Sequence, residues 1–208
     1  AAKHDTRKGV KTAAEWHGFA EVSDAALRLN RHVRGALLEG GVPVISLSPS
    51  ASVYCEDGVI QEMALGRVQD ALDAGLGPLI HGDVAFDGRL GGTIVSTEEV
   101  MTFLADHLDP HWLLLAGETA GVYDSQKVVI PKITDGNFEQ VKIHLGGSRG
   151  TDVTGGMLSK VQGMLDLVTA HPMLSIKIFS GGEAGLIERL LLEPASAVGT
   201  LIYTAGVR

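Results

Sequence analysis

A glycine-rich stretch is the part of this chain best suited to binding a phosphate group. Residues 146–157 read GGSRGTDVTGGM, and five of the first eleven are glycine. Glycine lets a backbone approach a ligand closely. Residues 157–168 predict an amphipathic helix, whose start offers unpaired N–H groups and the positive end of a dipole. Lys160 falls in the first turn of that predicted helix and adds a cation, so the stretch predicts a phosphate site. The alternative is an ordinary surface loop capped by Thr154.

Other polar segments lie at or near the ends of predicted strands. In open α/β sheets, ligands bind beyond the carboxyl ends of the strands. We therefore expect a ligand site to draw on the following segments: His81-Gly82-Asp83, Ser96-Thr97, residues 116–118 with Glu118, and residues 180–182.

Short apolar runs alternate with amphipathic segments along nearly the whole chain. The predicted strands are 42–47, 78–81, 112–116, 174–179 and 199–203, with a hairpin or loop at 54–60 around Asp57-Gly58 and a turn between strands at 88–93. The predicted helices are 23–39, 61–74, 96–107, 137–144, 157–168 and a last one ending at Leu192. This alternation predicts an α/β fold, a three-layer αβα sandwich around a mostly parallel sheet.

Composition narrows the class of protein. A length of 208 residues suits one large domain or two small ones, and 45% hydrophobic with 20% charged residues is typical of a soluble globular protein. The formal net charge of −8 argues against a nucleic-acid partner. No apolar run approaches the ~20 residues of a membrane span, so we expect no membrane association. The single cysteine, Cys55, cannot form an internal disulfide, which favours a cytoplasmic protein.

Four blocks of this sequence resemble the amino acid kinase superfamily, most closely its isopentenyl phosphate kinase branch. The most specific block is the glycine-rich stretch 146–157 with Lys160, which resembles the nucleotide loop of the family. The others are Gly18-Phe19, Leu29-Asn30 and 41–43; the segment 81–84 with Asp87 and 94–99; and Gly181-Gly182 with 198–202. Together they span nearly the whole chain.

The resemblance implies ATP-dependent phosphorylation of a small alkyl phosphate, with isopentenyl phosphate becoming isopentenyl diphosphate. It implies one domain over 1–208, with an acceptor half over about 1–110 and a nucleotide half over about 111–208, and a homodimer. Gly156 and Lys160 would contact ATP phosphates, Thr97 would touch the substrate, and Glu118 would lie near the nucleotide. Bringing two anions together requires cations and aligned N–H donors, so we also expect Mg²⁺ beside ATP.

The sequence also departs from the family pattern. The family usually has Asp-Val-Asp-Gly-Val-Tyr after the central strand, whereas this chain has Glu118 and Ala120 at the two carboxylate positions. Family members begin with a strand, a Gly-Gly-Ser loop and a lysine, then a segment ending in Ser-Phe-Gly-His whose histidine contacts the substrate phosphate. Because this sequence contains none of these parts, we expect further sequence upstream and little kinase activity from the 208 residues alone.

Each remaining candidate has a functional and a structural interpretation. Asp152 would orient Lys160 or bind the nucleotide indirectly, or form a loop hydrogen bond. Asp83 would act near the transferred phosphate, or stabilise a turn. His81 would bind phosphate, or be structural. The predicted site is then catalytic Lys160 and Asp83; nucleotide-binding Glu118, Asp152, Gly155, Gly156 and Lys160; and substrate-binding Gly82, Ser96 and Thr97, with no metal ligand among the side chains.

Two other functions remain open from the sequence. One is a related kinase acting on a phosphonate antibiotic, acetylglutamate or a nucleoside monophosphate. The other is a regulatory protein that binds ATP without turnover, which Ala120 and the missing opening segment would favour. Detection of ATP binding without turnover would separate the regulator from the enzymes.

Overall fold

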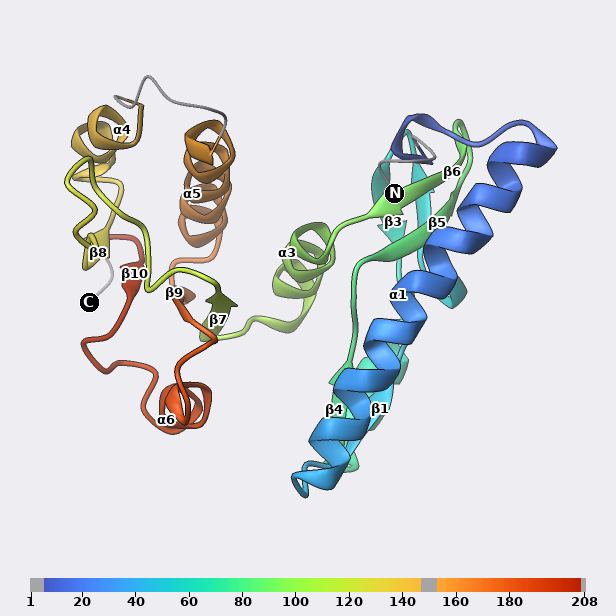
Figure 1. Cartoon of the computed structure of the whole chain (residues 1–208), viewed down its shortest axis with the longest axis horizontal. Coiled ribbons are helices and arrows are strands. Elements are labelled where there is room, and N and C mark those ends of the chain that lie inside the picture. The colour runs from blue at the N-terminus through green and yellow to red at the C-terminus, as the bar shows by residue number, and fades with distance from the viewer. Residues whose placement is uncertain (1–5, 147–152, 207–208) are drawn as a thin grey trace. The chain divides into compact units, whose positions relative to one another are not determined.

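The computed structural model of the chain describes residues 6–146 and 153–206 (Figure 1). The chain divides into two compact units, an N-terminal unit of residues 1–104 and a C-terminal unit of residues 105–208. The boundary falls within helix α3 (Thr97–Leu108).

Within its described residues, the N-terminal unit contains two sheets beside a long helix (Figure 1). One sheet has the strand order β3-β2-β5-β6, and in the other β1 pairs with β4 in parallel. Its elements before α3 are η1 (Thr6–Lys8), α1 (Ala13–Glu39), β1 (Val44–Ser46), η2 (Pro49–Ala51), β2 (Tyr54–Glu56), β3 (Val59–Glu62), α2 (Leu65–Asp73), β4 (Gly77–Leu79), β5 (Asp83–Asp87) and β6 (Gly91–Val95).

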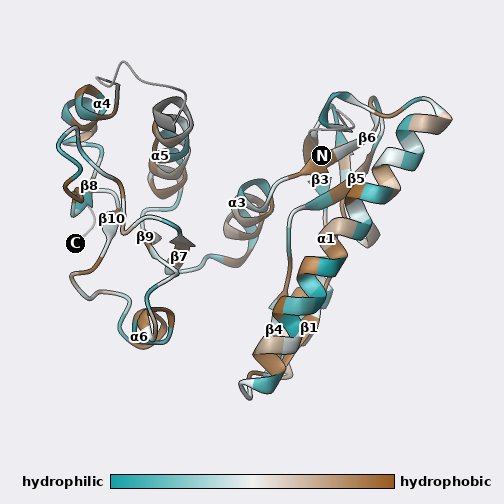
Figure 2. Ribbon diagram, in the orientation of Figure 1, coloured by the Kyte–Doolittle hydropathy of each residue, from teal (hydrophilic) through white to brown (hydrophobic). Residues whose placement is uncertain are grey.

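Helix α1 begins where a capping box fixes its first turn. The hydroxyl of Thr12 accepts from the backbone N–H of Glu15 at 3.3 Å, and the Glu15 carboxylate accepts from the N–H of Thr12 at 2.7 Å. Hydrophilic and hydrophobic residues are mixed along the helix (Figure 2). Phe19 is buried against Val84 of β5, and a Cβ on Gly92 of β6 would come within 2.8 Å of its ring. The missing side chain at Gly92 therefore lets α1 lie close to the sheet.

Residues of β5 alternate between two layers of the core. Val84 packs with residues of α1, whereas Ala85 packs with Val95 and with Val100 of α3. Helices thus cover both faces of this sheet, α1 on one and α3 on the other.

Asp87, at the end of β5, holds two turns together. Its Oδ1 accepts from the backbone N–H groups of Asp57, Arg89 and Leu90 at 3.2, 2.9 and 2.8 Å. Its Oδ2 accepts from the N–H of Gly58 at 2.7 Å. Burial by itself raises the pKa of Asp87, but the backbone donors outweigh burial and keep this pKa below its usual value. One carboxylate therefore orders both the β2–β3 turn and the β5–β6 turn.

We expect Asp87→Asn to lower the free energy of unfolding by about 2–3 kcal/mol at pH 7, because the amide replaces an acceptor oxygen with a second donor. A carboxylate whose pKa is lowered by folding stabilises the protein above its unfolded pKa and loses this effect as the pH falls through the folded pKa. The difference between wild type and variant should therefore shrink below about pH 4. Urea denaturation of both proteins at pH 7 and pH 3 measures this difference in the free energy of unfolding. Asp57→Asn, an exposed change in the same hairpin, is the control, and an equal loss in both variants would refute the special role of Asp87.

The C-terminal unit contains a sheet between helices on both faces (Figure 1). The strand order among its described residues is β7-β9-β10-β8. Ile176 and Ile178 of β9 pack in the core with α4 and α5, whereas Phe179 packs with α6 on the opposite face. Its elements after α3 are β7 (Trp112–Gly117), β8 (Lys132–Ile133), α4 (Phe138–Gly146), α5 (Val153–Ala170), β9 (Ser175–Ser180), α6 (Leu186–Leu192) and β10 (Thr200–Ile202).

The start of β10 connects distant parts of this unit. Gly199 has a φ of +73°, and a Cβ there would lie 2.2 Å from the carbonyl oxygen of Ile178. The hydroxyl of Thr200 accepts from the N–H of Val122 at 2.8 Å and donates to the carbonyl of Ile130 at 2.7 Å. Gly199 and Thr200 therefore fix the segment that follows β7 to the sheet.

Gly199→Ala should lower the free energy of unfolding by about 3 kcal/mol or more, because strain at positive φ adds to a backbone clash. The matched control is Gly185→Ala in the same unit, where φ is +77° but a Cβ would have no atom of a described residue within 4 Å. That change should cost only about 1 kcal/mol. Thermal unfolding of both variants tests this, and similar losses would show that the contact with Ile178 is relieved without cost.

The predicted α/β fold is confirmed, and several element boundaries need correction. Of the seven strand pairings among the described residues, four are parallel. The predicted helix 23–39 begins ten residues earlier, at Ala13. The predicted helix 61–74 begins only at Leu65, because residues up to Glu62 continue the hairpin. Asp57 and Gly58 both have positive φ, as a two-residue hairpin turn requires.

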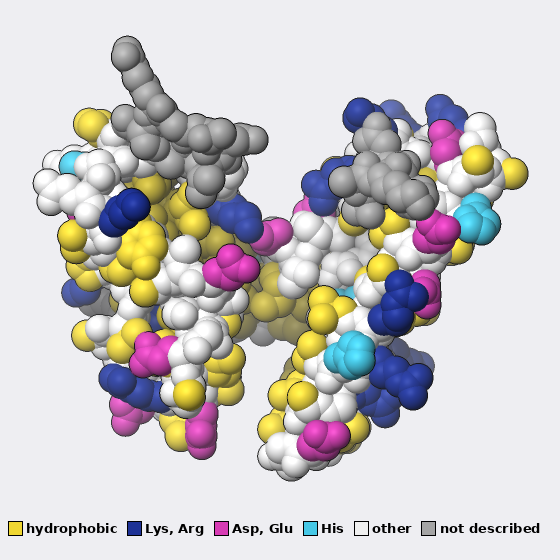
Figure 3. All heavy atoms as spheres, viewed as in Figure 1, with side chains coloured by type: hydrophobic (Ala, Val, Ile, Leu, Met, Phe, Trp, Pro, Cys, Tyr) yellow, Lys and Arg dark blue, Asp and Glu magenta, His cyan; other side chains and the backbone are white. Residues whose placement is uncertain are grey.

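Charged side chains of both signs lie on the face of the molecule seen in Figure 3. In the described part of the chain, no helix has the length and apolar character needed to cross a membrane.

Candidate functional site

A polar cluster lies beyond the carboxyl ends of β1 and β4 in the N-terminal unit. The hydroxyl of Ser46 donates to Oδ1 of Asn30 at 2.6 Å, and Nδ2 of Asn30 lies 3.1 Å from Nδ1 of His81. Nε2 of His81 lies 3.8 Å from Oδ2 of Asp83, whose side chain is 0% exposed. Oδ2 of Asp83 also accepts from the backbone N–H of Ser50 at 3.2 Å. Segments far apart in the sequence thus meet around Asp83, one of the predicted site residues.

The predicted substrate segment 96–97 lies next to this cluster. The backbone N–H of Gly82 donates to the hydroxyl of Thr97 at 3.1 Å, and a Cβ on Gly82 would be only 3.0 Å from the Thr97 nitrogen. The hydroxyl of Ser96 accepts from the N–H of Glu99 at 3.2 Å, and the Glu99 carboxylate accepts from the N–H of Ser96. The structure therefore brings Gly82, Asp83 and Thr97 together, and it uses Ser96 as the cap of α3.

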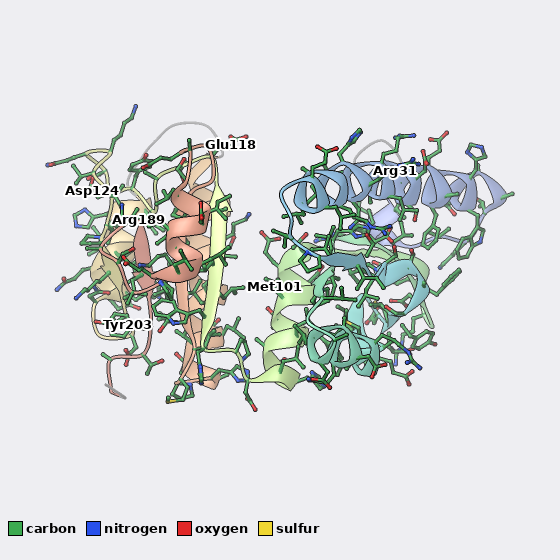
Figure 4. The ribbon with its side chains drawn as sticks, turned by 90° about the horizontal axis from the view of Figure 1, so that it is seen from below. Arg31, Met101, Glu118, Asp124, Arg189 and Tyr203 are labelled. Atoms are coloured by element: carbon green, nitrogen blue, oxygen red, sulfur yellow. The ribbon has the colours of Figure 1, made fainter. Side chains whose placement is uncertain are left out.

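Glu118 lies at the end of β7 in the C-terminal unit and is exposed (Figure 4). Strands β7 and β9 run parallel, with Gly117 opposite Ser180, so their carboxyl ends are adjacent. The N–H of Gly181 donates to the carbonyl of Gly117 at 2.8 Å. This edge of the sheet has the location expected for a ligand of a parallel sheet.

The predicted phosphate-binding helix starts earlier than expected. Helix α5 begins at Val153 rather than at residue 157, so Gly155 and Gly156 lie in its first turn and Lys160 lies in the second. Gly156 has no positive φ, and a Cβ there would meet no atom within 4 Å among residues 6–146 and 153–206. Within the described residues, the fold therefore does not require a glycine at 156, and a glycine there leaves room for a ligand at the helix backbone. Lys160 is exposed, and Asp152 lies outside the described residues.

Sequence reasoning missed two features near these sites. The contacts of Asn30 with Ser46 and His81 join residues 16 and 51 positions apart. A polar residue on the buried face of a helix was the available signal for Asn30. Lys177, in the middle of β9, is only 1% exposed, and its ammonium donates to the carbonyl of Ser196. Burial lowers the pKa of Lys177.

Cys55 is buried in the core of the N-terminal unit. Burial raises the pKa of the Cys55 thiol to about 11, and the nearby Asp87 and Glu99 carboxylates add to this, so the thiol is not poised for reaction. Among the described residues, no group of three or more His, Cys, Asp or Glu side chains could hold a metal ion.

Comparisons with known proteins identify the family of this chain. The family profile described as "Amino acid kinase family" matches residues 1–179. The isopentenyl phosphate kinase of Haloferax volcanii is 38% identical over 168 residues, which cover 79% of this chain and 66% of that protein. The corresponding kinase of Methanothermobacter thermautotrophicus is 32% identical over 181 residues, covering 84% and 67%. The chain therefore spans about two thirds of the length of these curated relatives.

Solved structures show the same relationship. A crystal structure of isopentenyl phosphate kinase superposes with a TM-score of 0.77 at 25% identity, over 97% of this chain and 78% of that one. The product complex of the isopentenyl phosphate kinase from T. acidophilum superposes with a TM-score of 0.72 at 22% identity, over 97% and 77%, and supports the fold alone. With a profile match over most of its length and relatives above 30% identity, this chain belongs to the amino acid kinase family.

Proposed function

We propose that the protein transfers the γ-phosphoryl group of ATP to isopentenyl phosphate, forming isopentenyl diphosphate and ADP. The observation that carries this proposal is the similarity to proteins named isopentenyl phosphate kinase, at 30–38% identity over 79–84% of this chain. The polar cluster around Asp83 and the glycine-containing start of α5 are chemically suited to the two phosphate-bearing reactants.

The N-terminal unit would bind the acceptor and the C-terminal unit the nucleotide. A phosphate oxygen of the acceptor attacks the γ-phosphorus, a new P–O bond forms, and the bond to ADP breaks. This oxygen is already anionic near pH 7, so no general base is required, and positioning and charge neutralisation do most of the work. Gly82 and Thr97 would position the acceptor, with Asp83 near the transferred group.

The nucleotide would lie at the start of α5. The N–H groups before the fourth residue of a helix are unpaired, and in α5 these include the N–H of Gly155, which would face the ligand. Gly156 would let the phosphate approach the backbone closely, and Lys160 adds a positive charge. Glu118 and Asp152 complete the proposed nucleotide contacts. Mg²⁺ would be held chiefly by ATP phosphates and water. We further propose that the protein is a homodimer and acts in the cytoplasm. The single cysteine, Cys55, is buried and has no second cysteine to pair with, which favours a reducing compartment.

An acceptor panel tests this function. The protein, expressed from its complete reading frame, is assayed for ATP consumption with isopentenyl phosphate, a phosphonate antibiotic, acetylglutamate and a nucleoside monophosphate. We expect the highest kcat/KM with isopentenyl phosphate. A higher value with another acceptor would assign the protein to a different substrate within the family, and ATP binding without turnover on any acceptor would make it a regulator.

A further inference from the structure

One ring nitrogen of His81 is left without a hydrogen-bond partner. Nδ1 lies 3.1 Å from Nδ2 of Asn30, which is itself held by Ser46, but Nε2 is covered and forms no hydrogen bond within the described part of the chain. The nearby Asp83 oxygen, at 3.8 Å, is too distant for one. Buried polar atoms without a partner are uncommon in native proteins, and each calls for an explanation.

The surrounding network requires that Nε2 carry a hydrogen. If the Asn30 amide donates to Nδ1, the neutral ring must hold its hydrogen on Nε2. The hydroxyl of Ser46 donates to the Asn30 oxygen, and the Asn30 nitrogen therefore faces Nδ1. Nε2 is thus an N–H donor that lacks an acceptor within the described part of the chain.

We propose that this Nε2–H binds an oxygen of a phosphate monoester, the acceptor phosphate of the proposed reaction. The inference rests on the proposed function and adds to it a ligand-binding residue. His81 lies just beyond β4, where the parallel strands β1 and β4 end, and its neighbour Gly82 contacts Thr97 at the start of α3. The ligand would thus meet a histidine N–H beside the first turn of a helix, two features that favour an anion.

The Asp83 carboxylate lies close to the proposed phosphate site, and its negative charge would by itself oppose binding of an anion. The backbone N–H groups of Ser50 and Val84 donate to its two oxygens, at 3.2 and 2.8 Å, so both oxygens are already engaged by positive dipoles. A hydrogen on Nε2 of His81, which lies 3.8 Å from Oδ2, offsets the negative charge of the carboxylate further. Since Nε2 is covered while 15% of the His81 side chain is exposed, the contact forms only when the surrounding atoms move aside on binding.

The first test is nitrogen-15 NMR of the protein labelled at histidine. We expect the His81 Nε2–H signal to shift saturably on addition of isopentenyl phosphate or inorganic phosphate, and not on addition of chloride at equal ionic strength. His17, an exposed histidine on α1, is the internal reference and should not respond. A His81 signal that stays unchanged at saturating phosphate would overturn the proposal.

The second test compares KM values. His81→Asn should raise the KM for isopentenyl phosphate about tenfold, the usual cost of one hydrogen bond to a charged group, without changing the KM for ATP. His81→Gln, which can restore a donor, should recover part of the loss, and His17→Asn should have no effect. An unchanged acceptor KM in a folded, active His81→Asn protein would refute the role of His81 and leave the proposed function intact. If no acceptor is turned over but phosphate still shifts the His81 signal, the site stands and the proposed reaction fails.

Discussion

Gly156→Val is expected to abolish ATP binding and to leave the fold intact. A Cβ at 156 would meet no atom of the described residues within 4 Å, and the residue lies in the first turn of α5 without a positive φ. The change therefore introduces no clash with the described part of the chain, and valine has a helix propensity no worse than that of glycine. A phosphate lying against the helix backbone would meet the added side chain.

The same helix provides a matched control. Gly163 also lies in α5, seven residues further along, and a Cβ there also meets no atom within 4 Å in the described part of the chain. Gly163→Val should therefore bind ATP like wild type. Calorimetric titration with ATP, after circular dichroism has shown that both variants are folded, measures the difference. Normal ATP affinity in Gly156→Val would remove this residue from the nucleotide site.

Lys160→Ala should reduce kcat/KM by about a hundredfold, because loss of one charge that stabilises the transition state costs on the order of 3 kcal/mol. Stability should change by less than about 0.5 kcal/mol, since Lys160 is exposed. Lys142→Ala on α4, whose ammonium pairs with Glu139 at 2.7 Å, removes a lysine from the same unit without touching the proposed site. Equal kcat/KM values for the two variants would contradict a catalytic role for Lys160.

Local signals in the sequence predicted several elements well. The helix predicted over 96–107 starts with Ser96-Thr-Glu-Glu99, which has the spacing of a capping box, and both hydrogen bonds of that box are present. Asp57-Gly58 predicted the turn between β2 and β3. Such features depend on residues within a few positions of each other, so the sequence contains the whole signal.

Boundaries were less predictable where local preferences conflict with the tertiary structure. The glycines at 155 and 156 argued against a helix, yet α5 includes both. Helix α1 starts with a second capping box, between Thr12 and Glu15, but the apolar periodicity that predicts this helix becomes regular only from about residue 23. Strand β8 has two residues, too few for any periodic pattern.

The contacts of the acceptor cluster could not be read from sequence. The segment His81-Gly82-Asp83 was recognisable because it follows a strand, but its partners Asn30 and Ser46 belong to α1 and β1. Which residue of a helix faces which strand end depends on how α1 packs, and that is decided by contacts such as Phe19 against Gly92. The same limit applies to Lys177, whose carbonyl partner lies 19 residues away.

Phosphorus NMR of a single reaction mixture tests the central claim most directly. The protein, expressed from its complete reading frame, is incubated with ATP, Mg²⁺ and isopentenyl phosphate. We predict that the monophosphate signal of the acceptor is replaced by the two coupled signals of a diphosphate, in step with the appearance of ADP. Conversion of ATP to ADP and free inorganic phosphate, or no change while ATP remains bound, would contradict the assignment of isopentenyl phosphate as the acceptor.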